Sequence, residues 1–143
     1  MKYAFDLGGT VTKYPEIFHC MIVSLQSSGW NQVFILTDMK DRANVRELMK
    51  LNGLEHHVLD SQIHLADYDR HGEACKAIVM RDLGIDVLVD DHGGYLVWPW
   101  PEPAPLRLLV TPDPRRPYTA PTWKTPDGEG FGRTAFVEGG GAR

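Results

Sequence analysis

Short runs of hydrophobic residues recur along the chain, and polar or flexible positions follow each of them. The run at residues 3–7 is broken only by Asp6, while those at 33–36 and 87–89 are fully apolar. Runs of this length without alternation are typical of parallel strands that are covered on both faces. Weaker runs at 63–65 and 106–110 predict two further strands.

Stretches with apolar residues at three- and four-residue spacing lie between these runs and predict helices. The first begins at Pro15, and its apolar positions are Ile17, Phe18, Met21, Ile22 and Leu25. The second ends at Asn52-Gly53, and its inward positions are Val45, Leu48 and Met49. The third spans residues 72–83, with a buried side expected at Ala74, Cys75, Ile78, Val79 and Leu83. Strands that alternate with helices predict an α/β fold, a three-layer doubly wound parallel sheet.

The end of the chain differs in composition from the rest. Nine of the ten prolines lie at or after Pro99, and the last residues are rich in glycine and charge. Such a segment contributes little to a core, so we expect one domain over residues 1–111 and a Pro/Gly-rich tail over 112–143. The proline-rich stretch 98–103 is predicted to be a stiff connector, with a polyproline ligand as the alternative.

Length and charge limit the classes of function. A chain of 143 residues has room for one hydrophobic core, so any activity must come from one domain or from a homo-oligomer of it. The formal net charge of -4 and the pI of 5.8 predict no broad affinity for nucleic acid or anionic membranes. No apolar run approaches about 18 residues, and the chain enters a strand directly after Lys2, so we expect a cytoplasmic protein. Cys20 and Cys75 have no disulfide or zinc spacing and are predicted to be buried thiols.

Residues capable of chemistry follow three of the apolar runs. These are Asp6, Thr37 and the pair Asp90 and Asp91. In a doubly wound sheet, ligands bind outside the carboxyl ends of the strands, so the residues are expected to meet in one cleft. The glycines after Asp6 allow the backbone of residues 8–10 to approach a phosphate. The sequence therefore predicts an anion site at this edge of the sheet.

The same carboxylates predict a metal site. Asp6, Asp90 and Asp91 would raise one another's pKa if they stood together without a cation. Mg²⁺ prefers oxygen ligands and commonly binds one or two carboxylates together with water and substrate phosphate. Lys76 is then expected to meet the phosphate.

In chain order, the segments Phe5-Asp6-Leu7-Gly8-Gly9-Thr10, Leu36-Thr37, Lys76 and Val89-Asp90-Asp91 resemble the motifs of the haloacid dehalogenase (HAD) phosphatase superfamily. The resemblance covers roughly residues 1–111 and implies a HAD-like Rossmannoid fold. Predicted helices and strands fill the intervals between the motifs, which leaves no room for a cap domain. An open site would take a large substrate, or would be covered by a neighbouring subunit or by the tail.

The resemblance also implies a role for each matching residue. Asp6 would be the nucleophile that forms an aspartyl-phosphate, and Thr37 and Lys76 would hold the phosphoryl group. Gly9 and Thr10 would lie in the substrate-binding loop. The ligands of Mg²⁺ would be Asp6, the carbonyl of Gly8, Asp90 and Asp91.

The chain departs from this family at Gly8. Family phosphatases typically carry a second aspartate there, which protonates the leaving group and later activates water. Loss of general acid-base help commonly costs about 10²–10⁴ in rate. Three residues near the predicted cleft are alternative proton donors, namely Lys13, Asp38 and His92.

Several functions follow from this pattern. The first is a Mg²⁺-dependent phosphohydrolase that acts on a phosphorylated small molecule or nucleotide. Because dehalogenase, phosphonatase and ATPase branches also differ at this position, the alternatives include altered chemistry and a weak or inactive HAD-like binding protein. The segment Asp6-Leu7-Gly8-Gly9-Thr10 also resembles the phosphate loop of sugar kinases, but those enzymes need a second large lobe.

Overall fold

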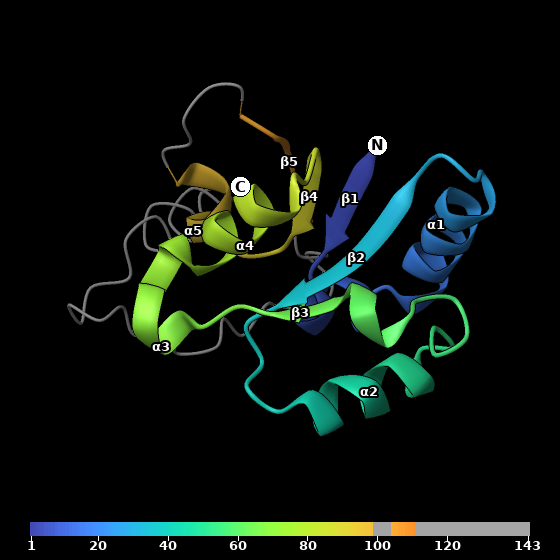
Figure 1. Ribbon diagram of the computed structural model, residues 1–143. Helices are drawn as coiled ribbons and strands as arrows, with labels where there is room; N and C mark the ends of the chain where they lie inside the picture. Colours follow the sequence, from blue (N-terminus) through green and yellow to red (C-terminus); the bar gives the residue numbers. More distant parts are fainter. Residues whose placement is uncertain (99–103, 111–143) are drawn as a thin grey trace, which may run out of the picture.

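The computed structural model describes residues 1–98 and 104–110 and consists of a sheet with helices on both faces (Figure 1). The strands are β1 (Lys2–Phe5), β2 (Gln32–Thr37), β3 (Ile63–Leu65), β4 (Val87–Asp90) and β5 (Leu106–Leu109). The helices are α1 (Pro15–Ser27), α2 (Arg42–Leu51), α3 (Tyr68–His71), α4 (Cys75–Leu83) and α5 (Gly93–Val97). Three short turns are η1 (Leu7–Val11), η2 (Asp60–Gln62) and η3 (Gly72–Ala74).

The five strands are all parallel and lie in the order β3-β2-β1-β4-β5. The chain builds outward from β1 to β3 and then returns to the other side of β1 to form β4 and β5. In doubly wound sheets, ligands bind where the direction changes, which here is at the carboxyl ends of β1 and β4. The predicted α/β class and parallel sheet are therefore confirmed.

Side-chain alternation along the central strands creates two separate cores. Phe5, Ile35 and Val89 face one core, which α1 and α2 close with Phe18, Ile22, Val45 and Met49. Ala4, Leu36 and Leu88 face the other core, which α4 and α5 close with Cys75, Met80 and Tyr95. Figure 1 shows these two helix pairs on opposite sides of the sheet, so the expected three layers are present.

Local sequence signals set the ends of several helices. Pro15 occupies the first turn of α1, where its missing N–H costs nothing. The carboxylate of Asp41 accepts a hydrogen bond from the amide of Ala43 at 2.9 Å and caps α2. Gly84 ends α4 in the left-handed conformation, with φ of 66°.

Helix α1 buries a narrower face than its apolar pattern suggests. Phe18 and Ile22 are buried, but Ile17 is 59% and Met21 40% exposed. Cys20 is exposed, so the prediction of a buried thiol there is wrong, whereas Cys75 is buried as predicted. Because only one stripe of α1 meets the sheet, residues one position away from Phe18 and Ile22 face outward.

The third helix begins later than predicted and turns a different face to the sheet. Residues 72–74 form η3, and α4 begins at Cys75. Its buried residues are Cys75, Lys76, Ala77 and Met80, while Ala74, Ile78, Val79 and Leu83 are half-buried. Cys75 is buried as predicted, and the partly exposed Val79 and Leu83 pack against the core, but the inward face also carries Lys76, Ala77 and Met80, which were not predicted.

Other predictions meet the limits of the described residues. Helices α3 and α5 were not predicted, since neither is long enough to show a period. Within residues 1–98 and 104–110, no helix has the length and hydrophobicity needed to cross a membrane. The predicted tail and most of the proline-rich connector lie outside the described residues.

Candidate functional site

The pairing of β1 with β4 brings Asp6 and Asp90 side by side at the carboxyl ends of the two strands. Phe5 is paired with Val89, and the amide of Asp6 donates to the carbonyl of Val89 at 2.9 Å. Neighbouring strands lie about 4.8 Å apart, so the next residues, Asp6 and Asp90, are adjacent. Both also share the face of the sheet that α4 covers.

Lys76 of α4 joins these two carboxylates. Its Nζ donates to Oδ1 of Asp6 at 2.7 Å and to Oδ2 of Asp90 at 2.6 Å. The side chain of Lys76 is only 1% exposed, and both carboxylates are buried. The arrangement is therefore a buried ion cluster and not a solvated pair.

Burial and charge shift the pKa of each member of the cluster. Burial disfavours the ammonium of Lys76, but the charges of Asp6 and Asp90 outweigh it and hold the pKa of Lys76 above its usual value. Burial raises the pKa of Asp6 well above that of an ordinary aspartate, although Lys76 opposes this shift. Burial also raises the pKa of Asp90 against Lys76 and the amide of His92. For both carboxylates, burial therefore outweighs the opposing effect of Lys76 on the pKa.

Asp91 completes a set of three carboxylates suited to a metal ion. One oxygen each of Asp6, Asp90 and Asp91 lies within 4.8 Å of the others. The hydroxyl of Thr10 donates to Oδ1 of Asp91 at 3.3 Å. Asp91 packs so closely on Gly9 that a Cβ there would lie 2.3 Å from its Oδ2. An all-oxygen donor set of this kind fits a hard divalent cation.

The loop η1 has less free polar backbone than the sequence predicts. The amide of Gly9, which has φ of 78°, donates to Oγ1 of Thr12 at 3.0 Å. Thr10 is fully buried, and its hydroxyl donates a hydrogen bond to the carboxylate of Asp91. Gly9 and Thr10, predicted to bind substrate, are thus brought to the carboxylate cluster. Gly8 is exposed, and a Cβ there would meet no atom within 4 Å.

Thr37 lies at the end of β2, next to β1, and is fully buried. Its Oγ1 accepts a hydrogen bond from the amide of Met39 at 3.3 Å, which leaves its hydroxyl proton available. In the described part of the chain, the hydroxyl of Thr37 has no hydrogen bond to Asp6 or Lys76. It is thus at the predicted edge of the sheet without joining the ion cluster.

The three alternative proton donors differ in their surroundings. His92 is buried, with its Nε2 3.0 Å from Oε2 of Glu73. Asp38 is half-buried and accepts a hydrogen bond from the hydroxyl of Tyr95 at 2.8 Å. Lys13 is half-buried, with its Nζ 5.9 Å from the centre of the Tyr14 ring.

Glu73 and Tyr95 are the residues that the sequence did not reveal. Tyr95 belongs to α5, which has five residues and shows no period. Glu73 precedes α4 and looks like a solvated charge in the sequence, yet it is buried. Only their contacts in the folded chain identify them, namely those of Glu73 with His92 and of Tyr95 with Lys76.

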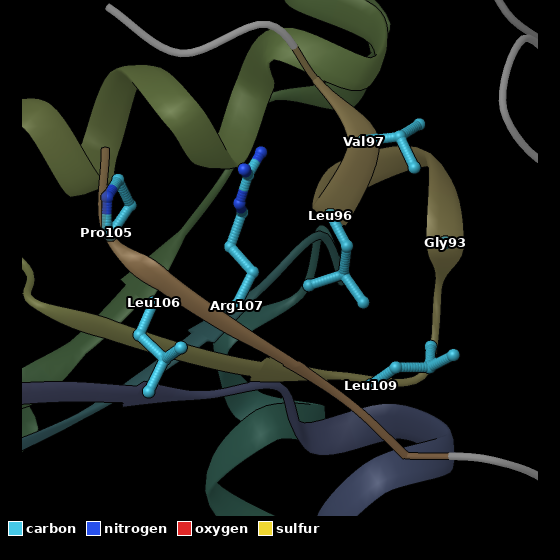
Figure 2. A pocket seen from close by; sticks show the side chains of 7 residues that line it. All are labelled: Gly93, Leu96, Val97, Pro105, Leu106, Arg107 and Leu109. Atoms are coloured by element: carbon cyan, nitrogen blue, oxygen red, sulfur yellow. The ribbon is translucent and has the colours of Figure 1, made fainter. Parts of the chain in front are cut away.

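A pocket of about 430 Å³ lies between α5 and β5 (Figure 2). Its lining residues are Gly93, Leu96, Val97, Pro105, Leu106, Arg107 and Leu109. They are mostly apolar and include no member of the carboxylate cluster. The titratable groups meet at the buried ion cluster and not in this pocket, so the cluster is the candidate functional site.

Comparison of the chain with known protein families, curated proteins and solved structures finds no match. The interpretation of the site consequently depends on its own residues and geometry.

Proposed function

We propose that the chain is a capless, Mg²⁺-dependent phosphohydrolase of the HAD type, which transfers the phosphoryl group of a small molecule or nucleotide to Asp6. The observation that carries this proposal is the bridge from Lys76 to Asp6 and Asp90. A carboxylate nucleophile must stay ionised at neutral pH, and a cation beside it favours the ionised form. The all-parallel sheet, which brings Asp6 and Asp90 together at the carboxyl ends of β1 and β4, supports the same reading.

The metal ligands in this proposal are Asp6, Asp90 and Asp91, with the carbonyl of Gly8 as a further ligand. Their carboxylate oxygens are close enough to share one ion, and Lys76 alone balances only part of their charge. When bound, Mg²⁺ would stabilise negative charge on the transferring phosphoryl group.

The proposed reaction has two displacements at phosphorus. First, an oxygen of Asp6 attacks the phosphorus, the bond to the leaving oxygen breaks, and Asp6 becomes an aspartyl-phosphate. Lys76 and Thr37 donate hydrogen bonds to the phosphoryl oxygens. Water then attacks, inorganic phosphate leaves, and the carboxylate of Asp6 is restored.

Gly8 restricts the substrates that this reaction suits. No side chain at this position gives a proton to the leaving oxygen, so the proton comes from solvent. Substrates whose leaving groups depart readily as anions are therefore favoured. A second candidate function, phosphate binding without turnover, is favoured by the same glycine.

The binding partners and the cellular location of the chain remain predictions from its sequence. They comprise a phosphorylated small-molecule substrate, no membrane or broad nucleic-acid binding, a possible homo-oligomer and a cytoplasmic location.

The test is hydrolysis of an aryl phosphate and a nucleotide panel with Mg²⁺ or EDTA. We expect Mg²⁺-dependent turnover that Asp6→Asn abolishes, while Asp60→Asn, at an exposed residue paired with Arg46, leaves it unchanged. Circular dichroism checks that both variants are folded. Turnover retained in Asp6→Asn contradicts the nucleophile, and phosphate binding by calorimetry without turnover favours the second function.

A further inference from the structure

The ammonium of Lys76 has a third neighbour besides its two carboxylates. Of its three N–H donors, two hydrogen bonds go to Asp6 and Asp90. The ring of Tyr95 lies beneath the same nitrogen, with 4.6 Å between Nζ and the ring centre. An aromatic face attracts a desolvated cation at this distance. The ring therefore contacts the same ammonium that the two carboxylates bind.

The hydroxyl of Tyr95 fixes one end of that ring. It donates to Oδ2 of Asp38 at 2.8 Å, and Tyr95 is only 1% exposed. Burial raises the pKa of the Tyr95 phenol, and the charge of Asp38 raises it further, so the phenol stays protonated and can donate. Asp38 directly follows Thr37, which links the ring to the end of β2.

His92 and Glu73 hold the same ring from another direction. The ring of His92 meets that of Tyr95 edge to face, with 4.6 Å between the ring centres. Both carboxylate oxygens of Glu73 lie within 3.1 Å of Nε2 of His92. A Cβ on Gly94 would lie 2.3 Å from Oε2 of Glu73, so α5 packs tightly on this carboxylate.

We propose that Tyr95 is the positioning residue that holds the ammonium of Lys76 between Asp6 and Asp90. Asp38 and His92 fix its ring, and α5 thereby controls a charge that α4 supplies. A lysine side chain has many rotamers, so a buried wall is needed to keep Nζ in one place. The kinetic consequence of this inference rests on the proposed function, whereas the placement of Nζ does not.

The first experiment observes the ammonium directly by NMR of the full chain labelled with ¹⁵N-lysine. Lys76→Met identifies the Lys76 signal, and the Tyr95 ring is expected to shift it upfield. We expect Tyr95→Leu to move or broaden this signal and Tyr95→Phe to keep its upfield shift. The matched control is Phe34→Leu, because Phe34 packs on the same core and, among the described residues, its ring makes no cation–π contact with Lys76. An unchanged signal in Tyr95→Leu would overturn the proposal.

A second variant covers the case in which Tyr95→Leu does not fold. Tyr95→Phe keeps the ring but removes its hydrogen bond to Asp38, so ¹⁵N relaxation of Lys76 Nζ should show greater motion. Motion equal to that of the wild-type chain would overturn the anchoring role of Asp38.

The kinetic experiment separates the positioning role from the proposed function. A misplaced catalytic group commonly costs about 10²-fold, so we expect kcat in Tyr95→Leu to fall 10- to 100-fold with little change in KM. Phe34→Leu should keep kcat within about threefold. If the wild-type chain shows no turnover, the proposed function fails, and the NMR result alone decides the placement of Lys76. Unchanged kcat in Tyr95→Leu contradicts the kinetic role.

Discussion

The site has two halves that differ in origin and in charge. The strand-end half consists of Asp6, Thr37, Asp90 and Asp91, and the order of a parallel sheet brings them to one edge, where the three aspartates cluster. The helix half consists of Glu73, Lys76, His92 and Tyr95, and contacts of η3 and α4 with His92 and α5 bring them together. In the proposed function, the first half supplies oxygen ligands and a nucleophile, and the second supplies a cation that offsets their negative charge.

Each half is costly when buried alone. Unpaired carboxylates and an unpaired ammonium both lose their hydration inside a protein. Their meeting at 2.6 and 2.7 Å offsets that cost without removing it, since the pKa values of Asp6 and Asp90 remain raised. The stability of the fold and the proposed chemistry therefore depend on the same contacts.

Removing the cation is the most severe way to break this pairing. Lys76→Met keeps a long apolar stem but leaves Asp6 and Asp90 buried without a positive partner. We expect a loss of about 3–5 kcal/mol in the free energy of unfolding, measured by urea denaturation. The control Lys50→Met, at an exposed position of α2, should change stability by less than about 0.5 kcal/mol. A loss of stability in Lys76→Met as small as that in Lys50→Met would contradict the buried pairing of Lys76 with Asp6 and Asp90.

The pH dependence of the same variant sharpens this prediction. The pKa of Asp6 is raised above 3.8, mainly by burial, so the folded chain binds this proton more tightly than the unfolded chain. Its contribution to stability is therefore fully present below pH 3.8 and is lost as the pH rises through the raised pKa. Without Lys76 the pKa of Asp6 moves higher still. The difference in the free energy of unfolding between the wild-type chain and Lys76→Met should therefore become smaller as the pH falls. A deficit that does not vary with pH would argue against this account.

Adding the missing acid tests the strand-end half alone. The backbone at Gly8 has φ of -75° and ψ of 124°, and its Cβ position is open, so Gly8→Asp fits without strain. We expect hydrolysis of an alkyl phosphate, a poor leaving group, to increase by about 10²-fold or more. Gly8→Asn has the same shape without the acid and should give no such gain. Equal rates in the two variants would discount the missing acid.

The smallest expected effect distinguishes two neighbouring glycines. Gly9 has φ of 78°, and an added Cβ would collide with Asp91, so Gly9→Ala should cost about 1–2 kcal/mol and weaken Mg²⁺ binding. Gly8 has neither a positive φ nor a neighbour that an added Cβ would meet, so Gly8→Ala should leave the free energy of unfolding unchanged or slightly higher. Thermal unfolding with and without Mg²⁺ measures both. Similar losses in the two variants would contradict the role given to Gly9.

The strand-end half was predictable because short apolar runs ended at Asp6, Thr37 and Asp90. A parallel sheet converts that order along the chain into proximity at one edge. The α/β class, the strand segments and the residues of the carboxylate cluster followed from this rule. Lys76 was predicted only as part of a series of motifs, since its surrounding helix pattern suggested a different buried face.

Glu73 and Tyr95 of the helix half were not predictable because tertiary contacts, and not sequence period, place them. Tyr95 lies on a helix of five residues, too short for a hydrophobic pattern to emerge. Glu73 is polar, and only its contact with His92 explains its burial. Cys20 was misplaced for the opposite reason, since an apolar-rich helix contacts the sheet along one narrow stripe.

The most direct measurement is detection of a phosphorylated Asp6. Because Gly8 provides no base to activate water, the aspartyl-phosphate should break down slowly and accumulate with aryl phosphate and Mg²⁺. Borohydride reduces an acyl phosphate to an alcohol, so mass spectrometry should find homoserine at position 6, absent with EDTA or in Asp6→Asn. Phosphate release without any modification at position 6 would contradict phosphoryl transfer through this carboxylate.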